Sequence, residues 1–423
     1  MRIRIWAFGF WLWTGVAIAQ AQSLISDSYI VTFKQPGVAR QGFSVAAFAP
    51  RALSQMQAAS TLSDSTASSL RSQLKISGSV RSVYDRINAV HLNISATEAQ
   101  KLQSDPRVLR VEQNRTVSLV GTQMNPGWAL DRIDQAYTWP NNQYNYAFDG
   151  TGRTVYVLDS GLNLAHPTVA AEFGGRAQII YDVNGGNGSD CYFHGTAVAA
   201  AAAGKTYGVA KNAKLMIAKI TSGCTDSTDT AVLTMALNWL AGNAPRGSIV
   251  NLSVGLESCA PYTNYAMESA IKAAHDAGII VVMAAGNASC DTSANSFTRL
   301  SQAFVIGATS EKYLTSLQKD AMATFTGHGG NIAGFAPGVR VLLLNHNGQK
   351  ILADGTSFAA PYVAGLFAAG CQAAGTLCNT MGSASVAYQA LKDKAVNGSI
   401  VTDAGASNLP SATPSRFFVR NAW

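Results

Sequence analysis

One serine near the carboxyl end of the sequence stands where a nucleophile could be activated. Ser357 lies in the run GTSFAAPYVAG at 355–365 and leads into an alanine-rich stretch that predicts a helix over 358–370. The start of a helix has backbone N–H groups without intrahelical partners and the positive end of the helix dipole, and both stabilise a developing negative charge. The alternative is an ordinary helix cap, because Ser and Thr are common cap residues. Partners for Ser357 elsewhere in the chain decide between the two.

A serine nucleophile needs a base, and the base needs an acid that orients it. Asp159 follows the apolar run 154–158, which predicts a buried strand, and open α/β sheets place their sites at the carboxyl ends of strands. His194 opens the small-residue run 194–204, which predicts a closely packed helix. Taken alone, a turn aspartate and a buried structural histidine are the simpler interpretations.

A fourth candidate could stabilise an oxyanion. Asn287 ends the apolar run IIVVMAAGN at 279–287, which predicts another buried strand. Its side-chain amide could donate a hydrogen bond to a negatively charged oxygen. The alternative is a turn asparagine before a loop.

The four motifs, Asp-Ser-Gly, His-Gly-Thr, Ala-Ala-Gly-Asn and Gly-Thr-Ser-x-Ala-Ala-Pro, occur in the order of the subtilase family of serine peptidases, which the chain closely resembles. The similarity is greatest to the secreted, proteinase K-like branch. It implies a subtilisin-like fold and an acyl-transfer reaction in which Ser357 is the nucleophile. In that reaction His194 is the base, Asp159 orients it, and Asn287 holds the oxyanion.

The residues after 120 carry a pattern of alternating strands and helices. Strands are predicted at 154–158, 215–220, 248–253 and 279–284, and helices at about 194–204, 228–241, 263–277 and 357–370. This alternation predicts an α/β fold with a parallel sheet and helices on both faces. We expect residues 121–423 to form the catalytic domain.

Residues 22–120 form a separate predicted unit with the order β-α-β-β-α-β. This order resembles the ferredoxin-like inhibitor propeptide of subtilases. The resemblance implies that the unit inhibits its own enzyme and that its tail, Val117–Gln123, lies in the active site and is cut there. The alternative is an unrelated accessory domain.

Residues 1–21 predict a secretory signal peptide, with Arg2 and Arg4 before an apolar core and small residues at the end. The core is too short for a membrane anchor, and we expect a secreted protein without a membrane span. The net charge is +7, but residues 122–423 carry 18 basic and 18 acidic residues. The expected mature part therefore gives no support for nucleic-acid binding.

All six cysteines lie between 191 and 378, and an even number in a secreted chain favours disulfides. The family resemblance implies a Cys191–Cys224 bridge. Cys371 and Cys378 are close enough for a local loop, which leaves Cys259 and Cys290, and that last pairing stays open. The chemistry requires no cofactor. Structural calcium is common in the family, but no calcium ligands are assigned; Asp182 and Asp190 could hold an ion, although a solvated turn is the favoured interpretation.

The resemblance also indicates where a peptide substrate lies. One edge of the substrate strand is expected at Ser253, Val254 and Gly255, and the facing edge at Asp226, Ser227 and Thr228. Asp226 and Thr228 are bulkier than the usual glycines and are expected to narrow the nearby pockets. Ala284, Ala285 and Gly286 are expected to wall the pocket before the cut, which favours apolar or aromatic side chains.

Two other functions compete with a monomeric secreted endopeptidase. A catalytically silent peptide-binding protein on the same scaffold would be free to lose the four site residues, all of which are present. A lipase or esterase would carry Gly-x-Ser-x-Gly and a different order of catalytic residues, and the sequence has neither.

Overall fold

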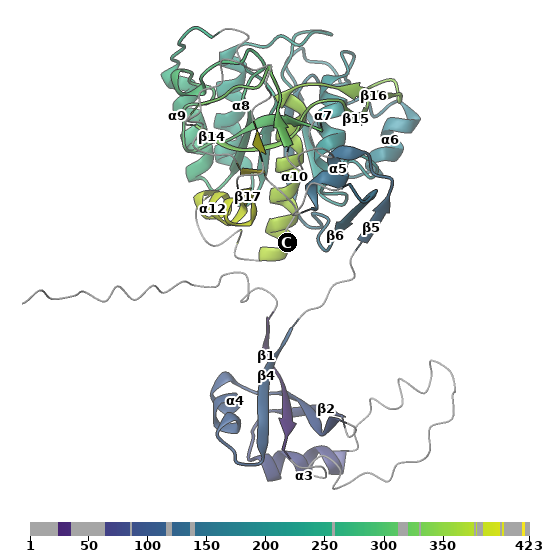
Figure 1. Ribbon diagram of the computed structural model, residues 1–423, viewed down its shortest axis with the longest axis vertical. Helices are drawn as coiled ribbons and strands as arrows, with labels where there is room; N and C mark the ends of the chain where they lie inside the picture. The colour runs from purple at the N-terminus through teal and green to yellow at the C-terminus, as the bar shows by residue number, and fades with distance from the viewer. Residues whose placement is uncertain are drawn as a thin grey trace, which may run out of the picture. The chain divides into compact units, whose positions relative to one another are not determined.

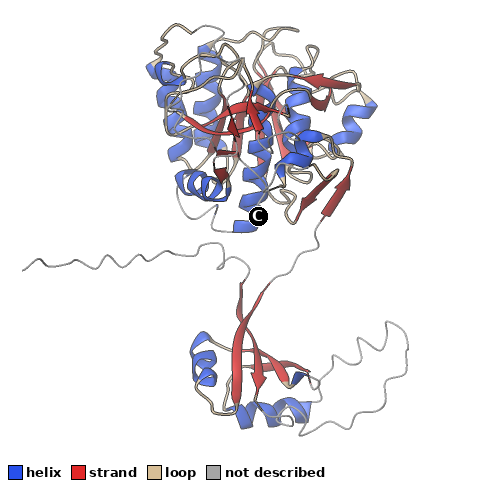
Figure 2. Ribbon diagram, viewed as in Figure 1, coloured by secondary structure: helices blue, strands red, loops and turns tan. Residues whose placement is uncertain are grey.

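The chain divides into two compact units, residues 1–118 and 119–423, which are described separately. The computed structural model describes residues 24–34, 64–84, 87–115, 121–135, 140–255, 259–311, 320–329, 331–375, 378, 384–397, 400–401 and 417–418. The predicted signal peptide lies outside the described residues. Figure 1 labels the helices and strands, and Figure 2 separates them by colour.

The first unit is a four-stranded antiparallel sheet with two helices, in the strand order β2-β3-β1-β4. Its buried core includes Val31, Val90 and Leu92 on the central strands. The helix α4 begins at a capping box, in which Ser95 and Glu98 satisfy each other's backbone N–H groups, as the sequence predicts. The elements in chain order are β1 (Leu24–Phe33), α3 (Asp64–Leu74), β2 (Ser79–Tyr84), β3 (Ala89–Asn93), α4 (Ala96–Gln103) and β4 (Val108–Arg115).

The second unit is built on a sheet whose central strands are all parallel. They are, in spatial order, β8 (Ala177–Asp182), β9 (Lys214–Lys219), β7 (Thr154–Asp159), β10 (Ile249–Leu252), β11 (Ile280–Ala284), β12 (Phe304–Ser310) and β14 (Ile332–Pro337). The inner strands are buried along almost their whole length, because helices cover parallel sheets. Short strands extend the sheet beyond β12 and β14: β13 (Asp320–Met322), β17 (Val396–Asn397), β18 (Ile400–Val401) and β19 (Phe417–Phe418).

Small residues let two long helices lie close together. The helices α7 (His194–Ala203) and α10 (Thr356–Ala374) pack against each other and against the sheet. A Cβ atom on Gly365 of α10 would meet the carbonyl oxygen of Ala202 at 2.6 Å, so the backbones almost touch there. A second pair, α8 (Thr230–Asn243) and α9 (Tyr265–Asp276), packs together and reaches the sheet through α9.

The remaining described elements of this unit are shorter helices and two two-stranded sheets. They are β5 (Gly121–Met124), α5 (Trp128–Ile133), β6 (Gln143–Tyr146), α6 (Pro167–Phe173), the short 3-10 helix η2 (Thr292–Ala294), β15 (Val341–Leu344), β16 (Lys350–Ala353) and α12 (Ala384–Lys394). The α/β class with a parallel sheet, preceded by a small α+β unit, is the one that the sequence predicts.

The structure contradicts one expectation about the tail of the first unit for residues 121–123. Val117–Gln123 was expected to lie in the active site, but Gly121–Gln123 belong to β5, which pairs antiparallel with β6. The side chain of Gln123 is held there by Lys211 Nζ at 2.6 Å and by the carbonyl of Thr206 at 2.9 Å. Residues 117–120 lie outside the described residues. The antiparallel pairing with β6 and this side-chain anchor hold residues 121–123 in a two-stranded sheet instead.

Candidate active site

The carboxyl ends of neighbouring parallel strands bring the predicted residues to one edge of the sheet. Leu252 of β10 pairs with Leu158 of β7 and with Met283 of β11, so the residues that follow each of them emerge side by side. Those residues are Asp159, Ser253 and Ala284. The helices α7 and α10 begin at the same edge with His194 and with Thr356, the residue before Ser357.

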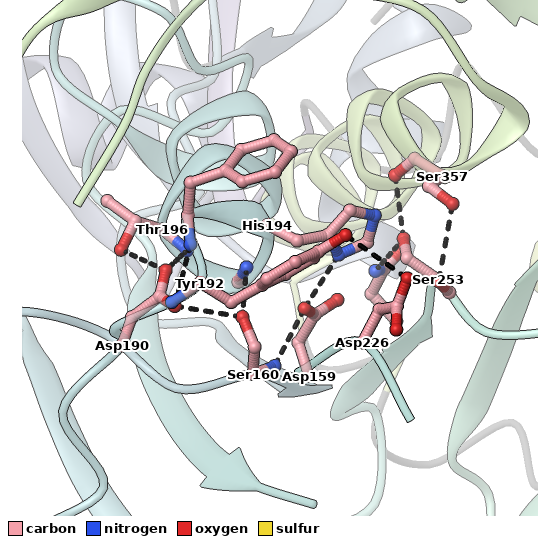
Figure 3. A network of polar contacts seen from close by, with 12 residues as sticks. Asp159, Ser160, Asp190, Tyr192, His194, Thr196, Asp226, Ser253 and Ser357 are labelled. Carbon is pink, nitrogen blue, oxygen red and sulfur yellow. Dashed lines mark hydrogen bonds and ion pairs between the residues drawn. The ribbon is translucent and has the colours of Figure 1, made fainter. Parts of the chain in front are cut away.

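Asp159 and His194 form a direct contact at this edge (Figure 3). The Nδ1 atom of His194 lies 2.7 Å from Oδ1 of Asp159, and the N–H of Ser160 donates to the same oxygen at 2.8 Å. The side chain of Asp159 is 2% exposed, whereas that of His194 is 19% exposed. We assign the proton to Nδ1 from this contact, which leaves Nε2 free to act as a base.

Two opposed effects set the pKa of His194. Burial lowers the pKa of the imidazole, but the carboxylates of Asp159, Asp190 and Asp226 and the hydrogen bond to Asp159 raise it, and the net pKa is above the usual value. The site is therefore built to stabilise a positively charged imidazolium. Such a charge forms on a histidine that has taken a proton from a nucleophile.

Two glycines allow the histidine to approach the aspartate. A Cβ on Gly195 would lie 2.3 Å from the carbonyl oxygen of Gly161, and a Cβ on Gly161 would lie 2.3 Å from the carbonyl oxygen of Gly188. Gly161 also has a φ of 108°, which L side chains rarely adopt. The glycines of Asp-Ser-Gly and His-Gly-Thr are thus required by close backbone contact at the end of β7.

The structure also reveals a buried residue that sequence reasoning did not place in the site. Asp190 was expected in a solvated turn, but it is 2% exposed. Its Oδ1 accepts from the backbone N–H groups of Tyr192 and Phe193 and from Ser160 Oγ. Its Oδ2 accepts from the N–H of Thr196 at 2.9 Å and from its hydroxyl at 2.7 Å. The turn interpretation was wrong because burial depends on the end of β7, which is distant in sequence.

These bonds of Asp190 hold a strained backbone next to the histidine. Phe193 has a φ of 112°, an uncommon value for a residue with a side chain, and it directly precedes His194 at the start of α7. Oδ1 of Asp190 accepts the N–H of Phe193 at 3.0 Å. The only signal in the sequence was the position of Asp190 just before the His-Gly-Thr turn.

Ser357 lies in the first turn of α10 and shares a cleft with His194. Its hydroxyl donates to the carbonyl oxygen of Ser253 at 3.3 Å, and Ser253 Oγ donates to the carbonyl oxygen of Ser357 at 2.7 Å (Figure 3). The serine hydroxyl therefore points to Ser253 in the resting structure. A hydrogen bond from this hydroxyl to His194 would require the hydroxyl to turn away from Ser253, and catalytic hydrogen bonds often tighten only when substrate binds.

Asn287 is oriented with its amide available as a donor. Its Oδ1 accepts from the backbone N–H and the hydroxyl of Thr356, each at 2.9 Å. The oxygen is thereby fixed toward Thr356, which directs the amide nitrogen to the other side. That nitrogen would lie 3.5 Å from a Cβ on Gly355, two residues before Ser357.

The cleft around these residues has a volume of about 960 Å³. It is lined by Asp159, His194, Asn287 and Ser357 and by most of the predicted substrate-binding residues, namely Ser253, Val254, Gly255, Asp226, Ser227, Thr228, Ala284 and Gly286. Ala285 is not among the residues that line this cleft but lines a small adjoining cavity together with Ala284 and Gly286. The structure thus gathers in one place segments that are up to about 200 residues apart in the sequence.

Three disulfides cross-link the second unit. They join Cys191 to Cys224, Cys259 to Cys290 and Cys371 to Cys378. The Cys191–Cys224 bridge is the one that the family resemblance implies, and the Cys371–Cys378 bridge is the expected local loop. Cys259 and Cys290 form the pair that the sequence left open. Within the described part of the chain, no group of three or more His, Cys, Asp or Glu residues could hold a metal ion. Structural calcium remains an untested expectation.

The fold and the site have the features of a serine hydrolase built on a parallel sheet. Residues 150–414 match the Subtilase family, and residues 28–120 match the Peptidase inhibitor I9 family. The chain belongs to the subtilase family.

Similar proteins agree with this membership. Alkaline serine exoprotease A of Vibrio alginolyticus is 34% identical over 354 residues, which cover 81% of this chain and 60% of that protein. The extracellular serine proteinase of Thermus sp. (strain Rt41A) is 32% identical over 283 residues, which cover 66% of this chain and 65% of that protein. The chain thus spans less than two thirds of the length of these curated relatives. The crystal structure of a cold adapted subtilisin-like serine proteinase matches with a TM-score of 0.59 and 31% identity, over 70% of this chain and 98% of that one.

Proposed function

We propose that this protein is a secreted serine endopeptidase that cleaves peptide bonds through an acyl-enzyme. The observation that carries the proposal is the contact of 2.7 Å between Asp159 and His194 in the cleft that also contains Ser357 and Asn287. The family membership and the names of the relatives, which include an extracellular proteinase, support the same reaction and location. Among the described residues, none of the helices has the length and apolar character needed to cross a bilayer.

In the proposed reaction Ser357 Oγ attacks the carbonyl carbon of the substrate while Nε2 of His194 takes its proton. Asp159 keeps the other ring nitrogen protonated and stabilises the imidazolium. The Asn287 amide and the first-turn backbone of α10 stabilise the negative oxygen. His194 then gives its proton to the leaving amine, and a water molecule, deprotonated by His194, releases the acyl group from Ser357.

The substrate strand is proposed to lie between residues 253–255 and 226–228, which both line the cleft. The pocket for the residue before the cut is proposed to be walled by Ala284, Ala285 and Gly286. The cavity beside them has a volume of about 20 Å³, room for about one water molecule or methyl group. This cavity shares Ala284 and Gly286 with the larger cleft, and its small neutral walls support the expected preference for apolar or aromatic side chains.

The first unit is proposed to act as an inhibitor that the enzyme itself removes. Its match to the Peptidase inhibitor I9 family supports this role. The mature protein is proposed to begin near residue 121, because β5 starts at Gly121 and belongs to the second unit. The mature enzyme is proposed to act as a monomer on peptides and proteins, without nucleic acid and without a cofactor in the chemistry.

Hydrolysis of casein by the wild type and by Ser357→Ala tests the proposal. The variant is expected to lose about 10⁶-fold in turnover, the loss that removal of the nucleophile causes in the related subtilisin. Ser301→Ala, an exposed serine outside the cleft, is the control and should retain full activity.

Three outcomes separate the competing functions. If Ser357→Ala cleaves casein as fast as the wild type, the proposed mechanism is wrong. A wild type that binds peptides without cleaving them would be a silent binding protein. A wild type that hydrolyses long-chain esters but not casein would be a lipase or esterase.

A further inference from the structure

The substrate cleft carries an uneven charge. Four aspartates line it, namely Asp159, Asp226, Asp229 and Asp354, and among the described residues no lysine or arginine lines it. Three of them have roles within the protein. Asp159 binds His194, Asp229 caps α8 through the N–H of Val232, and Asp354 accepts the backbone N–H of Arg340. Asp226 is exposed, and its carboxylate accepts hydrogen bonds from the hydroxyl groups of Tyr192 and Ser227 and not from a backbone N–H group.

Asp226 is nevertheless held in a defined position. The hydroxyl of Tyr192 donates to its Oδ2 at 3.1 Å (Figure 3). The Cys191–Cys224 disulfide joins the same two loops, since Cys191 adjoins Tyr192 and Cys224 is two residues before Asp226. The neighbouring Thr228 instead directs its hydroxyl to the carbonyl oxygen of Ile220 at 2.6 Å. Of the two bulky residues on this edge, Asp226 is the one whose polar group remains exposed beside the cleft.

The position of Asp226 relative to His194 indicates which substrate residue it meets. Successive side chains of an extended peptide point to opposite faces. If the residue before the cut enters the pocket at 284–286, the residue before that one points away from this pocket. We place its side chain beside Tyr192, His194 and Asp226, which all line the cleft and of which Tyr192 and Asp226 are hydrogen-bonded to each other. The carboxylate of Asp226 is close enough to His194 to raise the pKa of that imidazole.

We propose that Asp226 is a specificity-determining residue that favours lysine or arginine two residues before the cleaved bond. The inference rests on the proposed peptidase function and refines it. The carboxylate of Asp226 is fixed by Tyr192 on Oδ2. Its Oδ1 accepts a long hydrogen bond of 3.5 Å from Ser227 Oγ and can also accept one from a substrate ammonium or guanidinium group. A neutral side chain at this place gains no such contact, and an acidic one is repelled.

The test compares short fluorogenic peptides that differ only two residues before the cut, with arginine, lysine, glutamine or glutamate there. For the wild type, kcat/KM is expected to be about fivefold higher for the basic peptides than for glutamine, the order of one partly exposed ion pair. Asp226→Asn should lower the ratio of kcat/KM for the basic peptides to kcat/KM for the glutamine peptide to about one. Because the pair is partly exposed, the ratio in the wild type should also fall as salt is added.

Asp229→Asn is the matched control, because it removes another charge from the cleft while asparagine still caps α8. It should leave the arginine-to-glutamine ratio as in the wild type. A wild type that cleaves basic and glutamine peptides equally fast overturns the role of Asp226 while the peptidase function stands. If Asp229→Asn loses the ratio to the same extent, the preference for basic peptides belongs to the charge of the whole cleft, and the proposed role of Asp226 is also overturned. Failure to cleave any peptide, combined with inactivity on casein, contradicts the peptidase function itself.

Discussion

The behaviour of His194 follows from the carboxylates around it. Asp159 contacts the ring directly, whereas Asp190 and Asp226 act through their charge, and together they keep the pKa of the imidazole above its usual value despite burial. A base with a raised pKa stays protonated, and inactive, up to a higher pH. We therefore expect activity to rise with pH through a window above the pKa of a free histidine, and this window should move down when one of these charges is removed.

Asp190→Asn tests the residue that only the structure placed near the site. Asparagine has one acceptor oxygen where Asp190 uses two, so buried N–H or O–H donors lose partners at about 1–3 kcal/mol each. We expect lower stability, a fall in kcat of more than about tenfold as His194 loses its support, and an acid limb of the kcat/KM profile that moves to lower pH. The measurement is the pH profile of purified variants, with Asp182→Asn at the half-buried end of β8 as the control. An unchanged kcat and an unchanged acid limb would show that Asp190 does not position His194.

At the scale of elements, the site depends on how closely α7 and α10 approach each other. Both helices start at the active-site edge and are rich in alanine, so the distance between their axes is set by backbone contacts and not by long side chains. Gly365 lies in this contact: a Cβ there would meet Ala202 O at 2.6 Å and Val209 Cβ at 2.8 Å. A shift of either helix displaces His194 or Ser357 with it.

Gly365→Ala is expected to lower both stability and activity. Alanine improves helix propensity by about 1 kcal/mol, but the overlap with backbone atoms costs about 1–3 kcal/mol and forces the helices apart. Gly242→Ala in α8 is the matched control, because nothing lies within 4 Å of its added Cβ. It should raise stability slightly and leave activity unchanged. Denaturant unfolding and peptide hydrolysis measure the two effects, and equal behaviour of the two variants would refute the close-contact argument.

At the scale of the whole molecule, the chain combines a small α+β unit with a larger enzyme-like unit. The net charge of +7 lies in the first 121 residues, and the remainder is neutral overall. Removal of the first unit therefore changes the charge of the protein strongly without changing that of the catalytic part. Lys211 holds β5 through Gln123, and we expect this contact to keep the start of the second unit folded after such a cut.

Maturation is expected to need Ser357. The secreted wild type should yield a product whose first residue lies near Gly121, whereas Ser357→Ala should remain an uncut precursor, because the same hydroxyl that attacks substrates must attack the chain itself. N-terminal sequencing and mass spectrometry of both secreted proteins, produced in a host without extracellular proteases, make the measurement. An uncut wild type, or an identical cut in both proteins, would contradict self-processing.

The sequence alone predicted four of the parallel strands, β7, β9, β10 and β11, and four helices of the second unit with the residues at their ends, but not β8, β12 or β14. Apolar runs such as 154–158 and 279–284 are buried because burial removes apolar surface from water. Neighbouring parallel strands then bring their carboxyl ends to one edge of the sheet. Asp159, His194, Asn287 and Ser357 could therefore be named from the sequence. The family could be recognised from the four motifs because each motif lies in a single short segment of the chain.

Only the tertiary structure decided how these segments meet. Asp190, which was expected in a solvated turn, is buried, and the Ser357 hydroxyl donates to the carbonyl oxygen of Ser253. Residues 121–123 pair with β6, and the Tyr192 hydroxyl donates to Asp226. Burial, hydrogen-bond partners and electrostatic fields depend on groups that are distant along the chain. A local pattern of residues cannot contain that information, because it is created by packing.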